Sequence, residues 1–247
     1  MLKCIHNYKL YVDLAEFSTT LFGYFHMIFV FVLCITQCCH VLLNISLYAC
    51  CTHQGQLFIL SDSSGLGDCD IIEVAIGADL CTIEEAEDFL NKVPEKQPFM
   101  ATSCCPAWSV MAKKLFPDFK PYISMALTPM TLTARLIKKQ HEKAKVVFIG
   151  PCAAKKLEAM RKSVRSEVDF VLTFEEMAGI FDAKHVDIEN IAEDEGGVNA
   201  ASRDGRNFAV AGGVAKSVVD VIAQMYPDKE IRVANAEGLK ECKKLLQ

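Results

Sequence analysis

The sequence predicts an α/β fold in which a mostly parallel sheet is flanked by helices, and three observations support this prediction. Beyond Asp62, short apolar runs of strand length alternate with amphipathic segments of helix length. Several of the helical segments begin with capping signals. The chain has 247 residues, of which 51% are hydrophobic and 23% charged, so it can bury a sizeable core.

The predicted elements alternate along the chain. Apolar runs predict strands at residues 71–76, 98–101, 146–149, 170–172, 208–211 and 231–234. Amphipathic patterns predict helices at residues 82–93, 108–115, 129–142, 174–183, 214–225 and 237–247. Residues 187–206 are acidic and contain glycine, so we expect a surface connection there.

Local signals mark where several of these helices begin. The segments 82–85 and 173–176 both have the Thr-x-x-Glu spacing of a capping box. Thr128 and Pro129 match an N-cap and a first helical position. The pair Gly212-Gly213 predicts a tight turn before the helix at 214–225.

Residues 1–61 differ in composition from the rest and are expected to be foreign to the fold, which leaves 62–247 as the folded domain. No Asp, Glu, Lys or Arg occurs from Phe17 to Ser61, and the apolar stretch 21–43 is long enough to span a bilayer. Two interpretations remain open, a membrane anchor and a mistranslated start. A single span with the usual charge orientation would place the cysteine-rich domain outside the cytoplasm, which argues against the anchor.

The charge and cysteine content narrow the class of protein. A net charge of -5 and a pI near 5.7 leave no basic stripe for phosphates, which argues against a nucleic-acid partner. Twelve cysteines accompany long helical patterns and a large apolar core, unlike a small secreted disulfide scaffold. We therefore expect a reducing, cytoplasmic location, with membrane association through 21–43 as the alternative.

Two cysteine-bearing turns contain the residues that are expected to bind a metal. The first reads TSCCPAW at residues 102–108 and the second GPCAAKKLE at 150–158, each where a predicted strand runs into a helix. The ends of strands in an open α/β sheet are where such folds bind ligands, so the turns are expected to meet at one site. The helix that follows each turn is expected to lower the thiol pKa and favour the thiolate that metals require.

The residues of the two turns suggest separate tasks. Successive side chains in extended backbone point in opposite directions, so Cys104 and Cys105 are not expected to bind the same iron. One of them can be a ligand of an iron-sulfur cluster while the other faces a neighbouring pocket. Lys155 lies one helical turn after Cys152 and can present its ammonium to an anion.

At these residues the chain resembles the C-terminal catalytic domain of the iron-only (FeFe) hydrogenase large subunit. The segment TSCCP with its Trp is similar to that family's first cluster motif, and PCxxKKxE to its second. The resemblance extends over about residues 70–247, including GADL with EEA at 77–86. It implies an H-cluster, a 4Fe-4S cubane joined through a cysteine sulfur to a di-iron subcluster with carbonyl and cyanide ligands.

The resemblance also implies roles for individual residues. Cys105 and Cys152 would be two of the four cubane ligands, Cys104 would pass protons to the di-iron unit, and Lys155 would pair with a cyanide. The residues that would line the di-iron pocket are Pro129, Phe208 and Val214. The residues that would form the proton route are Ser124, Glu85 and Asp88; a role of Glu85 in the capping box is the alternative.

The chain also departs from the family pattern. The third motif, with the other two cubane cysteines, is absent; Cys242 lies on a charged helix and is not expected to replace them. No ferredoxin-like CxxCxxC run occurs, and Gly150 stands where catalytic members often carry Met, which points toward the sensory branches. We therefore expect a fragment of the domain, incomplete at both ends and inactive alone or completed by another chain.

The resemblance implies reversible reduction of protons to hydrogen in the intact family, with a ferredoxin-like electron carrier or a completing subunit as partner. The first alternative is a non-catalytic 4Fe-4S module of iron-sulfur assembly or sensing; Cys104 and Lys155 argue against it, because their implied roles concern the di-iron unit. The second alternative is a membrane-anchored structural protein that uses residues 21–43.

Overall fold

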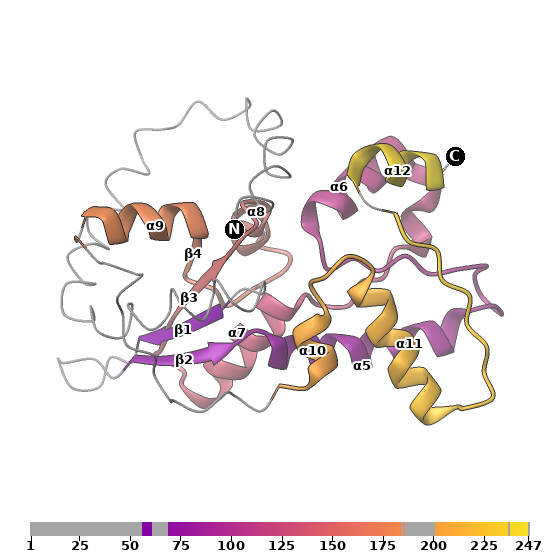
Figure 1. Cartoon of the computed structure of the whole chain (residues 1–247), viewed down its shortest axis with the longest axis horizontal. Coiled ribbons are helices and arrows are strands. Elements are labelled where there is room, and N and C mark those ends of the chain that lie inside the picture. Colours follow the sequence, from indigo (N-terminus) through magenta and orange to yellow (C-terminus); the bar gives the residue numbers. More distant parts are fainter. Residues whose placement is uncertain (1–55, 61–68, 184, 186–200, 237, 247) are drawn as a thin grey trace. The chain divides into compact units, whose positions relative to one another are not determined.

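The computed structural model describes residues 56–60, 69–183, 185, 201–236 and 238–246 (Figure 1). All of them belong to one compact unit, His40–Gln247. The apolar stretch 21–43 lies outside the described residues, as does most of the predicted connection at 187–206. No helix in the described part of the chain is long and apolar enough to cross a membrane.

The described sheet has four strands in the order β2-β1-β3-β4, which are β1 (Gln56–Leu60), β2 (Cys69–Glu73), β3 (Lys145–Gly150) and β4 (Phe170–Thr173) (Figure 1). Strands β3 and β4 are parallel, with Val147 opposite Phe170, as the βα alternation predicts. This pairing confirms the α/β class.

The pairings of β1 make the sheet mixed instead of mostly parallel. Strand β1 is antiparallel to both β2 and β3. The connection from β1 to β2 is too short for the crossover that parallel neighbours require, so the two strands can only pair in the antiparallel sense. Residues 56–60 were assigned to the apolar segment by composition, and the sheet shows that the folded domain includes them.

Three predicted strands are absent from the described sheet, namely 98–101, 208–211 and 231–234. Ala101 makes an isolated parallel bridge to Ile123, and Phe208 lies in a turn between helices. Phe208 instead packs with Ala78 and Cys81 of helix α5 (Ala75–Lys92), and Ile231 packs against a cluster of Ala86 of α5 with Val218 and Ile222. Within these runs Phe208 is buried, whereas Phe99, Val210 and Val233 are exposed, so a short apolar run does not by itself identify a strand.

Helix α5 begins at Ala75 instead of at the predicted start, Thr82, although it ends where expected, before Val93. The Thr82 hydroxyl donates to the Ala78 carbonyl at 2.8 Å, inside the helix, so the Thr-x-x-Glu spacing is not a capping box here. The small residues before Thr82 form a buried helical face, and the helix includes Ala75 and Ile76, which had been predicted as the end of the strand 71–76.

The other helix predictions are largely confirmed. They are α6 (Pro106–Leu115), α7 (Pro129–Gln140), α8 (Ala154–Met160), α9 (Phe174–Ala183), α11 (Gly213–Met225) and α12 (Gly238–Leu245). The helix α10 (Arg203–Asn207) and the 3-10 helix η1 (Pro117–Tyr122) were not predicted. Thr128 is the N-cap of α7. At the start of α9, the Thr173 N–H donates to Glu176 Oε2 at 2.8 Å and the Glu176 N–H donates to Thr173 Oγ1 at 3.2 Å, which is a reciprocal cap. Helix α10 had been predicted as connection.

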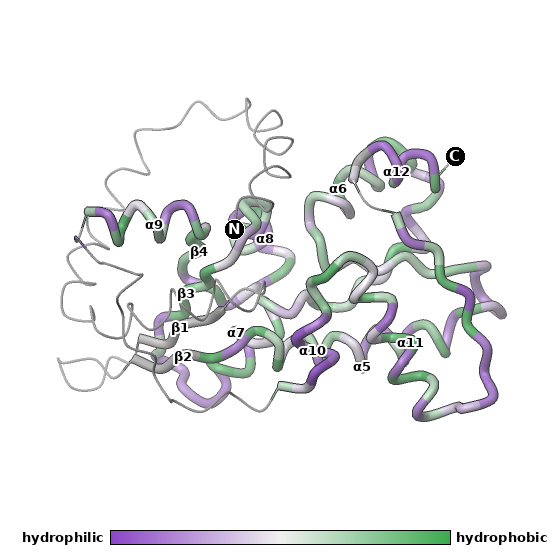
Figure 2. Tube along the Cα trace, viewed as in Figure 1, coloured by the Kyte–Doolittle hydropathy of each residue, from purple (hydrophilic) through white to green (hydrophobic). Residues whose placement is uncertain are grey.

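Apolar packing joins these helices to the sheet. Met130, Ala134 and Ile137 on one face of α7 pack against Val146 and Phe148 of β3, the buried strand that is green in Figure 2. Ala86 of α5 packs against α11, and Ala112 of α6 packs with Leu246 after α12. The segments that carry both cysteine turns are thus fixed on a continuous framework.

Gly77 lies where α5 crosses α7, and its replacement by Ala is expected to destabilise the fold. An added Cβ would lie 2.2 Å from Thr133 Oγ1 and 2.3 Å from the Pro129 carbonyl oxygen, so the helices must separate. We expect a loss of about 1–3 kcal/mol in the free energy of unfolding, measured with urea. Gly179→Ala is the control, because open space surrounds that position; an equal loss there would contradict the prediction.

Candidate functional site

The first cysteine turn is an extended segment that leads into α6. Cys105 occupies the N-cap position with an extended backbone, and Pro106 begins the helix. Inside the turn, the Trp108 indole N–H donates to the Thr102 carbonyl at 2.9 Å, and the Ser103 hydroxyl donates to the Ser124 carbonyl at 2.6 Å. These bonds hold the turn in place on both sides of the cysteine pair.

The second cysteine turn follows the carboxyl end of β3, as predicted. The carbonyl of Cys152 accepts the N–H of Lys155 at 3.1 Å, which closes the turn before α8. Cys105 and Cys152 are both free and partly buried. Burial raises the pKa of Cys152 first, and the charge of Cys105 raises it further, so the two thiols lie within electrostatic range.

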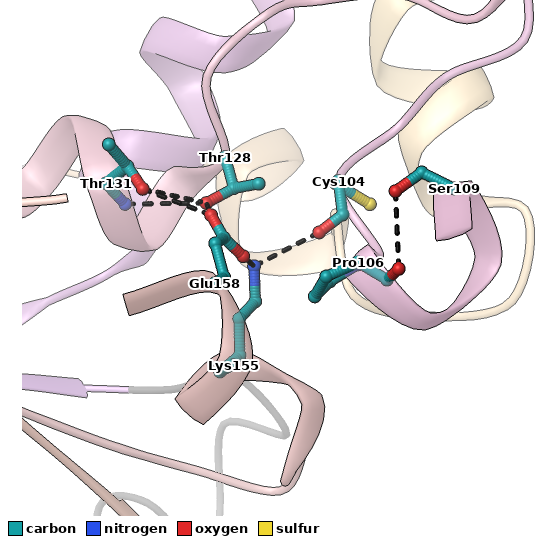
Figure 3. Close-up of polar contacts among 7 residues, drawn as sticks. All are labelled: Cys104, Pro106, Ser109, Thr128, Thr131, Lys155 and Glu158. Atoms are coloured by element: carbon teal, nitrogen blue, oxygen red, sulfur yellow. Dashed lines mark hydrogen bonds and ion pairs between the residues drawn. The ribbon is translucent and has the colours of Figure 1, made fainter. Parts of the chain in front are cut away.

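Lys155 joins the two turns, as Figure 3 shows. Its ammonium donates to the Cys104 carbonyl at 3.1 Å and to Glu158 Oε2 at 2.8 Å. Its side chain is only 13% exposed. A buried cation of this kind is stable only with such acceptors, so Lys155 is a fixed positive charge beside the first turn.

Cys104 is a protonated thiol in this environment. Burial raises its pKa to about 12, and the nearby Lys155 offsets only part of that effect. The expectation that the following helices lower the thiol pKa values is therefore wrong for Cys104 and Cys152 in the metal-free protein, because desolvation outweighs the helix N-terminus. A neutral Cys104 can donate its proton, and the thiolate that remains can take a proton back.

Three of the predicted site residues meet in one apolar cluster. Phe208 packs with Ala78 and Cys81, and the partly buried Cys104 and Val214 pack against them. Pro129 is buried as the first residue of α7. Phe208 reaches the cluster from the turn after α10, and Val214 from the start of α11, so elements far apart in sequence line the surroundings of Cys104.

The residues predicted for the proton route lie on α5 and beside the first turn. Glu85 is fully buried, and neither of its carboxylate oxygens has a partner with hydrogen-bond geometry in the described part of the chain. Burial raises its pKa to about 7, although the Ser124 hydroxyl and the Ser103 backbone lower it somewhat. Asp88 follows on the same helix and pairs with Lys92 at 2.7 Å.

The sequence analysis missed the contributions of Cys81 and Glu158. Cys81 is buried on α5 beside Cys104, and burial together with the charge of Glu85 raises its pKa. The spacing of Ala78, Cys81 and Glu85 would have revealed it, had the helix start been placed correctly. Glu158 belongs to the second motif, but no role was assigned to it.

Comparison with known proteins identifies the family. Residues 58–247 match the family model for the iron only hydrogenase large subunit, C-terminal domain. The chain belongs to this family. It is 25% identical over 197 residues to iron hydrogenase 1 of Clostridium pasteurianum, with 71% of this chain and 34% of that protein covered. The chain therefore spans about a third of the length of that hydrogenase.

Other relatives of the hydrogenase-like chain differ in their named roles. It is 30% identical over 100 residues to the cytosolic Fe-S cluster assembly factor of Kluyveromyces lactis, which covers 40% of this chain and 21% of that protein. A solved FeFe hydrogenase from Chlamydomonas reinhardtii superposes with a TM-score of 0.52 at 27% identity, over 67% of this chain and 46% of that one.

The donor groups fit part of a cluster site. Cys105 and Cys152 offer two thiols from separate turns, which suits a cubane, whose ligands commonly come from separate turns. Among the described residues, no group of three or more His, Cys, Asp or Glu side chains is placed to hold a metal ion. Burial, and after it the charge of Cys105, raises the pKa of Cys242. Cys242 nevertheless does not complete such a group among the described residues.

Proposed function

We propose that this chain provides half of the ligands of a hydrogenase-type iron-sulfur site, with Cys105 and Cys152 as thiolate ligands of a 4Fe-4S cubane. The observation that carries the proposal is that Lys155 joins two turns that each bear a partly buried free thiol, close enough for the charge of Cys105 to raise the pKa of Cys152. Both thiols must lose their protons to bind iron, so iron uptake should release protons.

The di-iron subcluster, when bound, supplies the redox chemistry that interconverts protons and hydrogen in this family. Lys155, whose ammonium contacts the Cys104 carbonyl, would pair with an anionic cyanide ligand of that subcluster. Phe208 and Val214, which pack in the apolar cluster with Cys104, and the buried Pro129 would line the site of the subcluster. A ferredoxin-like carrier supplies or removes electrons.

Protons reach the pocket through side chains of this chain. Cys104 holds a proton on its neutral thiol at neutral pH and can pass it on. Glu85, with a pKa of about 7, can take and release a proton near neutrality, and the Ser124 hydroxyl lies beside it. Asp88 connects this buried carboxyl toward the partly exposed surface of α5.

A second candidate function is a cubane-binding module without the di-iron unit, which acts in iron-sulfur assembly or sensing. The similarity to the assembly factor of Kluyveromyces lactis favours it. Cys104 and Lys155 favour the hydrogenase-type site instead, since neither is required to ligate a cubane. Because two thiolates bind a cubane weakly, both functions call for further ligands from elsewhere.

Anaerobic reconstitution with iron and sulfide tests the proposal. We expect the double variant Cys105→Ser, Cys152→Ser to lose most of the bound iron and the electron paramagnetic resonance signal of a reduced cubane. Cys242→Ser is the control and should keep both. Equal iron in the double variant and the unsubstituted chain would contradict the proposed ligands.

Hydrogen evolution separates the two candidate functions. A cubane signal without hydrogen evolution, after supply of a synthetic di-iron complex, would support the binding module. A complete H-cluster signal with turnover from the 247-residue chain alone would contradict the idea that further ligands are needed.

A further inference from the structure

We propose that Glu158 is a positioning residue that fixes the Lys155 ammonium against the Cys104 turn, and that the N-terminus of α7 holds Glu158 for this purpose. The inference rests on the proposed function, in which Lys155 addresses an anionic ligand. It goes beyond that function, because it assigns a task to a motif residue that neither ligates iron nor carries protons.

Glu158 divides its two oxygens between two segments, as Figure 3 shows. Its side chain is 5% exposed, so each oxygen needs a protein partner. Oε2 accepts the Lys155 ammonium at 2.8 Å. Oε1 accepts the hydroxyl of Thr128 and, at 3.1 Å, that of Thr131. A side chain on α8 is thus clamped to the first turn of α7.

The start of α7 suits an anion held in this way. Thr128 is the N-cap of this 12-residue helix, and its hydroxyl contacts Glu158. The unpaired N–H groups and the positive dipole end at a helix N-terminus stabilise a nearby carboxylate. The two threonine hydroxyls therefore hold the buried Glu158 carboxylate in one place, opposite the Lys155 ammonium.

The result for Lys155 is a defined position without any metal. Its long side chain would otherwise sample many rotamers, but two of its three N–H donors are occupied by Glu158 and the Cys104 carbonyl. One donor remains for a ligand, since no further acceptor is found among the described residues. The contacts run from α7 through Glu158 and Lys155 to the first cysteine turn, so they preorganise half of the site.

Glu158→Gln tests this role in the metal-free full chain. The amide oxygen can still accept the threonine hydroxyls, but the amide nitrogen faces Lys155 and cannot accept its N–H. Lys155 should then leave the Cys104 carbonyl. We expect its acetylation by an N-hydroxysuccinimide ester, followed by peptide mass spectrometry, to become about tenfold faster, because a buried charge-assisted hydrogen bond is lost.

The fluorescence of Trp108 gives a second readout. It is the only tryptophan of the chain and is bonded to Thr102 inside the first turn, so its quenching by acrylamide should increase in the variant. The matched control is Asp220→Asn, which removes a partly exposed carboxylate paired with the exposed Lys216. This control should change neither Lys155 acetylation nor Trp108 quenching.

Variants of Thr128 separate positioning from general stability. Thr128→Ser keeps the hydroxyl and should behave as the unsubstituted chain, whereas Thr128→Val should accelerate Lys155 acetylation in the same direction as Glu158→Gln. If Glu158→Gln does not fold, the comparison of Thr128→Val with Thr128→Ser tests the inference instead.

Three outcomes would overturn the inference. They are unchanged Lys155 acetylation in the folded variants, an equal effect of Thr128→Ser, and an equal rise at the distant Lys216, which would indicate general loosening. No iron enters the experiment, so its failure and a failure of the proposed cluster ligands can be told apart.

Discussion

Replacement of Glu85 with Gln is expected to remove a large pH dependence from the stability of this protein. Burial raises the pKa of Glu85 from 4.5 to about 7, since its carboxylate has no hydrogen-bond partner of good geometry among the described residues. The folded state therefore binds this proton more tightly than the unfolded state does. The effect on stability is confined to the interval between these two pKa values.

The sign follows from the direction of the shift. Below about pH 4.5 both states carry the proton, and the group costs nothing. As the pH rises to about 7, the unfolded state ionises while the folded state resists, so stability falls. The total loss is about 3 kcal/mol, and it is complete above pH 7. Glu85→Gln should lack this loss and be the more stable protein at pH 8.

Urea unfolding at pH 5 and pH 8 measures this difference. The relevant quantity is the change in free energy of unfolding between the two pH values, compared for the unsubstituted chain and Glu85→Gln. Glu87→Gln, on the exposed side of the same helix, is the control and should keep the full pH dependence. The same pH dependence in Glu85→Gln and the unsubstituted chain would show that another group is responsible.

The sequence predicted helices better than strands, for a physical reason. The helices at Pro106, Pro129 and Phe174 were found because proline and reciprocal Thr–Glu caps act locally, within one turn. The stretch 208–211 was mistaken for a strand because a short apolar run does not show which element its residues join; Phe208 is buried, whereas Val210 is exposed. The contacts of Phe208 with α5 depend on residues far away in the chain.

The sequence predicted which residues form the candidate site better than it predicted their pKa values. The motifs located Cys104, Cys105, Cys152 and Lys155 on two turns, and the structure places Lys155 in contact with the first turn. The raised pKa values of the thiols could not be predicted, because they depend on burial beneath Phe208 and neighbouring helices. The hydrogen bond from the Thr128 hydroxyl to Glu158 could not be predicted either, since it joins residues from separate helices.

Arg206→Met is expected to cost the most stability of the substitutions considered, because it leaves a buried carboxylate unpaired. Glu73, at the end of β2, is 1% exposed, and Arg206 holds it with two bonds, Nε to Oε1 at 2.9 Å and Nη2 to Oε2 at 3.1 Å. Removing one partner of such a buried pair costs about 3–5 kcal/mol, through desolvation of the remaining charge.

The free energy of unfolding measured with urea checks this expectation, and Arg203→Met is its control. Arg203 is on the same helix, but its side chain is 85% exposed and it lies 3.6 Å from Asp204, so its loss should cost less than about 1 kcal/mol. A loss for Arg206→Met no larger than that for Arg203→Met would contradict the role of the pair.

A second substitution shows that the penalty comes from the unpaired charge. The double variant Glu73→Leu, Arg206→Met removes both charges and should recover most of the lost stability, since an apolar pair needs no desolvated ion. The consequence reaches the candidate site: α10 ends at Asn207, and the next residue, Phe208, packs in the cluster that covers Cys104. The pair between β2 and α10 therefore helps to hold Phe208 in the cluster whose packing contributes to the burial of Cys104.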